Sequence, residues 1–349
     1  MKEPVLANDS PPRDDDELEE RLSRPSPEVI DALRRAAGDV IVLGAGGKMG
    51  PSLSAMLRRA ADALGDGRSV MAVSRFSSPD VAERLERYGI RVVRAELGDR
   101  AAIARLPDAA NVIYMAGQKF GTRDLPSLTW AVNTLIPAMV AERYAASRIV
   151  AFSTGNVYPL TPATGRGSRE GDALTPMGEY ANSCVGRERV LEHVSRTHGT
   201  PIAIIRLNYA VDLRYGVLVD IAHRVLSGQP VRVDMGFVNV IWQGDANAQS
   251  IRALTSAGSP PVAINVTGPD RLSVREAAQR LGDLLGATPI LEGAEAPDAL
   301  LSDTTFAQSL FGPPTISTDV LLQWVASWVA HGGTRLGKPT KFEVRDGRF

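Results

Sequence analysis

The sequence is poor in the residues that build disulfides and most transition-metal sites. It holds one cysteine, Cys184, and four histidines among 349 residues. A single cysteine excludes an internal disulfide and is typical of a reducing compartment. Apart from His193 and His198 the histidines are well separated, and with one cysteine the sequence holds no cluster of ligands at the spacing of a metal site. We therefore expect no metal cofactor and a cytoplasmic location.

Long apolar runs and an excess of one charge are also missing. No run approaches the roughly 20 apolar residues that span a bilayer, and residues 1–20 are acidic without the apolar core of a secretory signal. The 39 basic and 40 acidic side chains give a net charge of -1. This balance gives no electrostatic reason to expect nucleic acid or a membrane as partner. The expected partner is a small molecule.

The chain divides into four stretches by composition. Residues 1–26 are polar and acidic, which predicts a disordered leader, with a regulatory or oligomer-forming arm as the alternative. Residues 27–208 alternate short apolar runs with amphipathic segments and predict the main domain. Residues 209–331 lose this rhythm and predict mainly a smaller α+β lobe that binds substrate. Residues 332–349 are expected to form a C-terminal tail.

The alternation in residues 27–208 predicts a doubly wound parallel sheet of the Rossmann type. Nearly continuous apolar runs are typical of strands buried on both faces. Six such runs lie at residues 40–43, 70–73, 90–93, 111–115, 149–152 and 201–205. Helices are predicted from residue 27, after Gly50, and over 79–88, 100–106, 127–145 and 180–197. Strands alternating with helices indicate an α/β fold, and the lobe is expected over the strand ends, where such sheets bind ligands.

A glycine-rich turn joins the first strand to its helix. Its sequence is Gly44-Ala45-Gly46-Gly47-Lys48-Met49-Gly50. A first glycine permits the tight turn, a middle one lets the backbone approach a pyrophosphate, and a last one allows close helix–strand packing. The phosphates then meet backbone N–H groups and the positive helix end. In this context the motif predicts a dinucleotide site, with Gly44, Gly47, Lys48, Met49 and Gly50 as contacts.

Two later stretches, together with the glycine spacing, carry a family resemblance. They are residues 152–158, Phe-Ser-Thr-Gly-Asn-Val-Tyr, and residues 170–183, which end in Glu-Tyr-Ala-Asn-Ser. The chain resembles the extended branch of the short-chain dehydrogenase/reductase superfamily, the NAD-dependent epimerase/dehydratase-like enzymes, from about residue 38 to 331. The resemblance implies a nicotinamide cofactor and hydride transfer on a carbohydrate-like alcohol or ketone.

The end of the second strand bears on which nicotinamide dinucleotide is bound. Ser74 and Arg75 stand where an NAD-selective member of the family has an acid on the ribose hydroxyls. A hydroxyl and a guanidinium attract a 2′-phosphate instead, which predicts NADP, with NAD possible and a surface arginine as the alternative. The resemblance also implies contacts to the cofactor from Glu96, Leu97, Ala116 and Gly117. Lys119 faces either the cofactor or solvent.

The resemblance implies a hydroxyl that binds the reacting oxygen and a tyrosine that acts as acid/base. Thr154 takes the first place, with Ser153 as the neighbouring alternative, and Tyr180 takes the second. The family's lysine, expected four residues after the tyrosine, is replaced by Cys184. We expect this cysteine to be a small buried side chain in the place of the lysine, with a reactive thiol as the alternative.

Loss of the lysine matters because an ammonium group lowers the pKa of the tyrosine. An unperturbed tyrosine has a pKa of about 10, so roughly 0.1% is ionised at pH 7. Each unit by which the tyrosine pKa is no longer lowered costs about 1.4 kcal/mol for a step that needs the phenolate. Taking a proton from an alcohol should then be slow unless Arg187 or Lys119 supplies positive charge. Protonating a carbonyl suffers less, which favours a reductase. A surface position for Arg187 is the alternative.

Four polar residues are candidates for substrate contacts: Gln118, Asn156, Asn208 and Arg214. Asn208 resembles a substrate-contacting asparagine of the family, whereas the others are loop residues that solvent alone often surrounds. No signature of a sugar nucleotide site stands out, so a free sugar or sugar acid remains open. Asp245 and Ser273 are interpreted as helix caps.

Two hypotheses for function follow. The favoured one is an NAD(P)-dependent oxidoreductase or epimerase with Tyr180 as acid/base. The alternative is a dinucleotide-sensing or scaffold protein that binds the cofactor without turnover, because the lysine is missing. Helices such as 127–145 and 180–197 often form a dimer face in the family, so the resemblance implies a homodimer.

Overall fold

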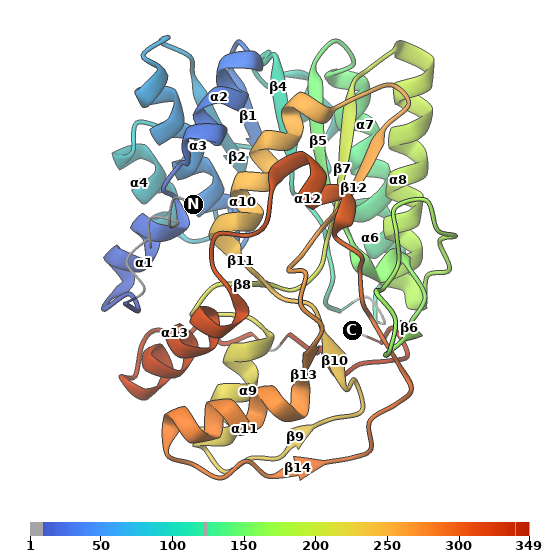
Figure 1. Cartoon of the computed structure of the whole chain (residues 1–349). Helices are drawn as coiled ribbons and strands as arrows, with labels where there is room; N and C mark the ends of the chain where they lie inside the picture. Colours follow the sequence, from blue (N-terminus) through green and yellow to red (C-terminus); the bar gives the residue numbers. More distant parts are fainter. Residues whose placement is uncertain (1–9, 122–123, 339, 349) are drawn as a thin grey trace.

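A seven-stranded parallel sheet forms the centre of the molecule (Figure 1). The computed structural model describes residues 10–121, 124–338 and 340–348. From edge to edge the sheet contains β3 (Arg91–Arg94), β2 (Val70–Ser74), β1 (Val40–Leu43), β4 (Asn111–Tyr114), β5 (Arg148–Thr154), β7 (Ile202–Leu207) and β12 (Val262–Val266). All neighbouring pairs are parallel. The predicted Rossmann-type α/β sheet is confirmed, and its six predicted strands all form.

Helices cover both faces of the sheet and bury its apolar side chains. One face packs against α2 (Pro27–Arg35), α3 (Gly50–Leu64), α4 (Pro79–Arg87), α10 (Gln243–Arg252), the short helix η3 (Ala253–Ser256) and α12 (Thr305–Phe311). The other packs against α5 (Arg100–Ala104), α7 (Ile136–Arg143) and α8 (Gly178–His198). The helix predicted over 127–145 is interrupted, because α6 (Pro126–Trp130) and α7 are joined by a π-helical turn, η1 (Ala131–Leu135).

The smaller lobe lies beyond the carboxyl ends of the strands (Figure 1). Its core joins α9 (Val217–Leu226), α11 (Val274–Leu285) and α13 (Thr318–Ala330). Short strand pairs border it: β8 (Ala210–Val211) with β11 (Ile241–Trp242), β9 (Val231–Arg232) with β14 (Leu291–Glu292), β10 (Phe237–Val238) with β13 (Leu272–Ser273), and β6 (Thr161–Pro162) with β15 (Asp298–Ala299). The short helix η2 (Gly155–Val157) follows β5. Although 209–331 was predicted mainly as lobe, α10, β12 and α12 of this stretch pack on the sheet.

The described part of the acidic leader is ordered, so the prediction of disorder for residues 1–26 is wrong over residues 10–26. It forms the helix α1 (Asp15–Leu22), in which Leu18 and Leu22 are fully buried. Asp14 caps the helix by accepting a hydrogen bond from the backbone N of Glu17 at 2.9 Å, and the acids of the first turn suit its positive end. The prediction failed because two leucines four residues apart form an apolar stripe inside a charged sequence. Residues 1–9 lie outside the described residues.

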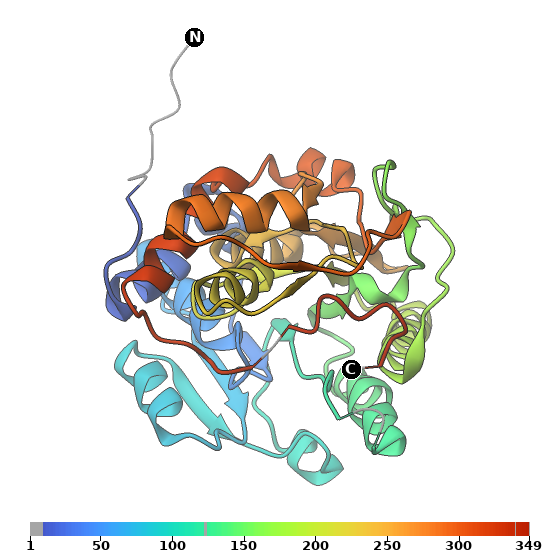
Figure 2. The same ribbon diagram turned by 90° about the horizontal axis from the view of Figure 1, so that it is seen from below.

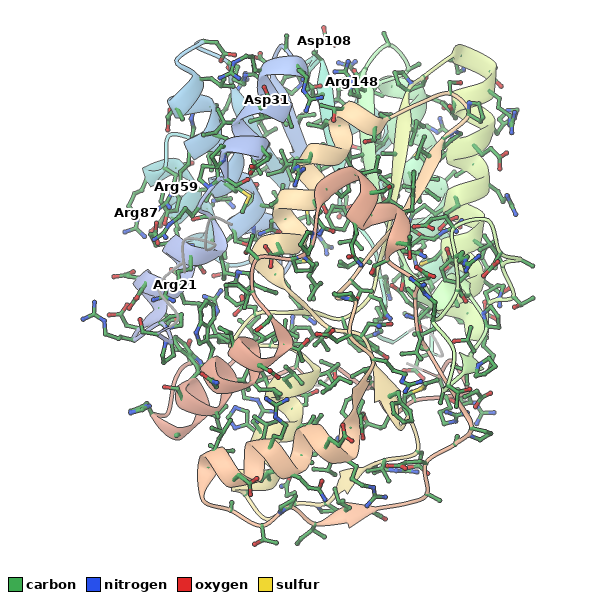
Figure 3. The ribbon with its side chains drawn as sticks, viewed as in Figure 1. Arg21, Asp31, Arg59, Arg87, Asp108 and Arg148 are labelled. Carbon is green, nitrogen blue, oxygen red and sulfur yellow. The ribbon has the colours of Figure 1, made fainter. Side chains whose placement is uncertain are left out.

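Ion pairs fix α1 between the two halves of the molecule. Glu19 lies 3.1 Å from Arg84 of α4 and 2.7 Å from Arg214 of the lobe. Glu20 pairs with Arg59 of α3 at 3.4 Å; Arg59 is labelled in Figure 3. The leader therefore connects the sheet half to the lobe. Among the described residues no helix is long and apolar enough to cross a membrane.

The C-terminal tail is also folded onto the molecule. Residues 332–338 and 340–348 leave α13 and run across the molecule toward the start of α8, as Figure 2 shows. Thr340 and Phe342 are buried, and Phe342 belongs to the core of the lobe. No pattern in the sequence indicates this packing, since the tail is polar and short of apolar periodicity.

Candidate active site

A cavity of about 400 Å³ opens between the carboxyl ends of the strands and the lobe. It collects residues that follow β1, β4, β5 and β7 together with the first turn of α8. Of the sequence-predicted site residues, those that line it are Gly44, Gly47, Lys48, Met49, Gly50, Gly117, Gln118, Thr154, Asn156, Tyr180 and Asn208. The sheet thus brings most of the predicted cofactor, catalytic and substrate residues to one place.

The glycine turn leaves no room for side chains at Gly44 and Gly50. A Cβ on Gly44, whose φ is +91°, would lie 2.6 Å from the backbone N of Ala116. A Cβ on Gly50 would clash with the carbonyl O of Ala45, so the start of α3 packs directly on the turn. Because no side chain covers these backbone atoms, a diphosphate can approach the N–H groups at the start of α3. The residues present therefore fit a bound dinucleotide.

The predicted adenosine contacts lie outside the cavity, at the ends of β2 and β3. Ser74 faces the turn, since a Cβ on Gly46 would lie 2.6 Å from its Oγ. Arg75 is 78% exposed and 3.5 Å from the carboxylate of Glu96. Leu97 is buried in the core beneath them. Arg75 is thus able to reorient toward a ligand, and its acidic neighbour offsets part of its charge.

Tyr180 and Thr154 meet at the other end of the cavity. Tyr180 lies in the first turn of α8, and both Thr154 and Cys184 are within hydrogen-bonding reach of its side chain. The Thr154 hydroxyl accepts hydrogen bonds from the backbone N of Asn156 at 3.2 Å and from its Nδ2 at 2.9 Å. Burial raises the pKa of Tyr180, and the positive charge of Arg187 opposes that rise. The phenol is therefore neutral at neutral pH.

Ser153, the alternative to Thr154, is held by another contact. Its hydroxyl donates a hydrogen bond to Oε1 of Glu188 at 2.6 Å. Glu188 in turn forms a buried ion pair with Arg206 at 2.7 Å. Ser153 therefore orients a structural carboxylate, and Thr154 is the hydroxyl that shares the surroundings of Tyr180.

Cys184 is fully buried in a small apolar cluster. Its neighbours there include Val157 and Tyr158, with Tyr180 packed against the cluster. Burial raises the pKa of the thiol, whereas a reactive cysteine needs a lowered pKa and access for the reagent. This environment suits a small side chain in the place of the lysine and does not suit a nucleophile.

Arg187 is buried and lines the cavity, so its interpretation as a surface charge is wrong. Its guanidinium donates to the carbonyl O of Phe152 at 2.6 Å, and to the carbonyl O and Oδ1 of Asn133 at 3.1 and 2.7 Å. A Cβ on Gly117 would lie 2.8 Å from Nη2 of Arg187. Within the described residues no carboxylate forms an ion pair with it. A fixed positive charge therefore lies beside the tyrosine.

Asn133 is a site residue that sequence reasoning missed. It is fully buried in the π-helical turn η1, and its side-chain amide exchanges two hydrogen bonds of 2.9 Å with the backbone of Gln118. It also binds Ser183 at 2.9 Å. One asparagine on the apolar face of a predicted helix was the available signal. Also missed were the cavity-lining Phe120, Phe152, Tyr209, Tyr215 and Thr340.

The predicted substrate residues separate into two groups. Gln118, Asn156 and Asn208 line the cavity, and Asn208 is buried. Arg214 does not line it. Its guanidinium pairs with Asp212 at 2.6 Å and with Glu19 at 2.7 Å, at the junction with α1. The prediction of Arg214 as a substrate contact is therefore wrong. Nothing in the local sequence indicates that its acidic partner Glu19 lies far away in the chain.

Comparison with known proteins identifies the family. The model of the NAD dependent epimerase/dehydratase family matches residues 40–230, more than half of the chain. The chain belongs to this family. None of the curated protein sequences matches it significantly. The matched range includes the glycine turn, Thr154 and Tyr180.

Solved structures share the fold at low sequence identity. The UDP-glucose 4-epimerase of Thermotoga maritima with UDP-glucose has a TM-score of 0.68 and 18% identity over 84% of this chain and 99% of its own. The Thermus thermophilus UDP-glucose 4-epimerase in complex with NAD has a TM-score of 0.66 and 20% identity over 83% and 98%. The UDP-glucuronic acid 4-epimerase of Bacillus cereus in complex with NAD has a TM-score of 0.68 and 16% identity over 84% and 99%.

Proposed function

We propose that this protein is an NAD(P)-dependent oxidoreductase or epimerase that acts on a carbohydrate-like alcohol or ketone. The observation that carries the proposal is one cavity lined by the glycine turn, Thr154 and Tyr180 together. The bare backbone around Gly44 and Gly50 would hold the diphosphate of the dinucleotide. When bound, the nicotinamide ring supplies the hydride donor or acceptor.

Tyr180 is the proposed acid/base, and Thr154 is the proposed hydroxyl that binds the reacting oxygen. Because burial raises the pKa of Tyr180, the phenol keeps its proton and can donate it to a carbonyl oxygen. Taking a proton from an alcohol is harder for the same reason, and the charge of Arg187 partly compensates. We therefore propose carbonyl reduction as the faster direction, with Gln118, Asn156 and Asn208 contacting the substrate.

The proposed preference is for NADP, with NAD as a weaker ligand. It rests on Ser74 and on the exposed guanidinium of Arg75, which a 2′-phosphate would attract away from Glu96. Isothermal titration with each dinucleotide measures the preference. Arg75→Ala should weaken NADP binding about tenfold and leave NAD binding unchanged. Equal affinities in the unaltered protein would exclude the preference.

The test of the main proposal is turnover of NADPH or NADP with a panel of sugars. The panel includes UDP-glucose and UDP-glucuronic acid, which solved structures of the same fold are described as binding, together with free ketoses and sugar acids. Tyr180→Phe should reduce turnover about 10²- to 10⁴-fold and leave dinucleotide affinity within about threefold. Tyr88→Phe, at the end of α4, is the matched control. Unchanged turnover in the Tyr180 variant would remove its role as acid/base.

A second candidate function is a dinucleotide sensor or scaffold. It is favoured by Cys184, which replaces the family's lysine and leaves Tyr180 with a raised pKa. This candidate expects dinucleotide binding with no turnover across the whole panel. A single substrate whose conversion depends on Tyr180 decides against it.

We also propose that two copies associate through α6 and η1. Large apolar side chains are exposed there, including Leu128, Trp130 and Leu135 at 45%, 40% and 51%, which is unusual for a surface that faces only water. Light scattering should give the mass of a dimer, and Leu135→Glu should shift it toward the monomer. A monomer at all concentrations would refute the pairing.

A further inference from the structure

The C-terminal segment, defined here as residues 335–338 and 340–348, crosses the molecule from the lobe toward the start of α8 (Figure 2). Thr340 lines the cavity itself. Leu336 and Lys338 line a second cavity of about 290 Å³, which also contains Gly46, Gly47 and Lys48 of the glycine turn. The segment therefore lies beside the glycine turn.

Contacts with the lobe and with α8 hold this segment in place. Thr340 donates from its backbone N and its Oγ1 to Oδ2 of Asp220, at 2.7 and 2.6 Å. Phe342 is buried in the core of the lobe, and Arg345 pairs with Asp298. Its far end reaches the helix that carries Tyr180, where a Cβ on Gly178 would clash with the carbonyl O of Gly347. The segment is thus a strap between the lobe and α8.

Ammonium groups from the turn and the strap converge on one aromatic ring. The Nζ atoms of Lys48, Lys119 and Lys341 lie 5.3, 5.7 and 5.7 Å from the ring centre of Phe120. Lys48 also lies 3.3 Å from the ring centre of Tyr215, and Lys338 joins it in the second cavity. Lys48 and Lys119 come from the loops after β1 and β4, whereas Lys338 and Lys341 come from the strap.

The second feature of this cluster is the scarcity of ion pairs at Lys48, Lys338 and Lys341. No carboxylate forms an ion pair with Lys48, Lys338 or Lys341 in the part of the chain that the structure describes. The nearby Asp220 accepts its hydrogen bonds from Thr340 and lies 3.7 Å from Arg335. Burial, together with Lys119 and Lys338, lowers the pKa of Lys48 to about 7. Holding like charges together in this way is unfavourable unless an anion binds between them.

We propose that the strap closes a diphosphate-binding site over the glycine turn, with Lys48 on one side and Lys338 and Lys341 on the other. A diphosphate ester matches the site because it carries two adjacent anionic groups and can span ammonium groups from two walls. Dinucleotides and nucleotide sugars both contain this group. The inference rests on the proposed function, and it assigns to the C-terminal segment a share in ligand binding.

The experiment measures the affinity of the full chain and of the double variant Lys338→Ala/Lys341→Ala for NADP, NAD and uridine diphosphate by isothermal titration. The variant should bind at least one of these diphosphates about 10- to 100-fold more weakly, since it loses two ammonium groups proposed to contact the ligand. Arg348→Ala is the matched control, because this exposed cation of the same strap pairs with Asp346 away from the cavity. A thermal melt of each variant verifies that it is folded.

The outcomes separate the two sources of the diphosphate and the two proposals. If the variant loses affinity for NADP and NAD alone, the strap binds the diphosphate of the dinucleotide. If it loses affinity for uridine diphosphate alone, the strap binds the diphosphate of a substrate. Affinities within twofold of the unaltered chain for every diphosphate that it binds overturn the inference and leave the proposed function standing. If the unaltered chain binds neither dinucleotide, the proposed function fails, and the affinity for uridine diphosphate alone then decides on the strap site.

Discussion

The two ends of the cavity carry positive charge in different ways. At the glycine-turn end, the ammonium groups of Lys48 and Lys341 rest against the rings of Phe120 and Tyr215, contacts worth about 0.5–2 kcal/mol that leave long side chains able to move. At the tyrosine end, Arg187 is fixed by hydrogen bonds to Phe152 and Asn133. In the proposed function, the adjustable ammonium groups bind the diphosphate, and the fixed guanidinium acts on the neighbouring phenol.

Gly44→Val should distort the glycine turn and cause the largest loss of dinucleotide affinity. The new side chain would meet the backbone of Ala116, and its φ of +91° is unfavourable for a β-branched residue. We expect dinucleotide affinity to fall at least about 100-fold, because the turn must move away from the ligand. Gly171→Ala is the control, since a Cβ there meets nothing within 4 Å.

Titration calorimetry and a thermal melt decide the result for Gly44. If the Gly44→Val variant does not fold, Gly44→Ala gives the same test with a smaller clash. Affinity within threefold in a folded variant would mean that the turn is not the dinucleotide site.

Arg187→Gln should alter the tyrosine end and leave the other end intact. Removing the guanidinium takes away the charge that opposes the rise of the Tyr180 pKa, so that pKa should rise further. Turnover in the oxidative direction should fall about tenfold for each unit of that rise, and Arg187→Lys should restore part of it. The pH profile of turnover and the ultraviolet titration of the phenol, with Tyr180→Phe as baseline, measure the change.

Arg189→Gln is the matched control for Arg187. It lies on the same helix, is 64% exposed, and pairs with Glu192 at 3.0 Å. An unchanged pH profile in a folded Arg187→Gln variant would show that the buried guanidinium is structural only.

The lowered pKa of Lys48 predicts a pH dependence confined to the glycine-turn end. Burial, Lys119 and Lys338 bring it to about 7, against the opposing effect of Asp220. A bound diphosphate stabilises the protonated form and raises the pKa. Affinity should therefore be highest below pH 7 and fall by up to about tenfold per unit as pH rises from 7 toward the raised value. Proton uptake on binding at pH 8, measured in buffers of different ionisation enthalpy, should disappear in Lys48→Met.

Cys184→Ala should have the smallest effect. The thiol is fully buried and its pKa is raised, so it should resist thiol reagents in the native protein and react only after unfolding. Turnover should stay within about threefold of the unaltered chain. Labelling of the native protein that also stops turnover would instead support the reactive-thiol alternative.

The sheet and the glycine turn could be predicted because short-range patterns determine them. Apolar runs such as 40–43 are typical of strands buried on both faces, and the spacing of Gly44 and Gly50 reflects backbone contacts within a few residues. Tyr180 and Thr154 could be placed because the chain resembles its family there. These predictions needed no knowledge of distant partners.

Other parts of the site could not be predicted because they depend on partners far away in the sequence. The sequence around Arg187 is typical of a charge on a helix surface. Only the packing of η1 against α8 shows that Asn133 accepts hydrogen bonds from its guanidinium. Arg214 was predicted as a substrate contact, but Glu19 lies 195 positions away. The strap was missed since its single buried aromatic, Phe342, gives no periodic pattern.

The path of the chain limits how the lobe could be exchanged for one of different specificity. The lobe is assembled from stretches separated by α10, β12 and α12, which pack on the sheet. A transplant would have to replace each stretch and keep the intervening sheet elements, rather than join two blocks at one point near residue 208. A cut there would also remove β12 from β7, leaving an apolar strand with an unpaired edge that favours aggregation. Specificity in this protein therefore has to be redesigned in place, residue by residue around the cavity.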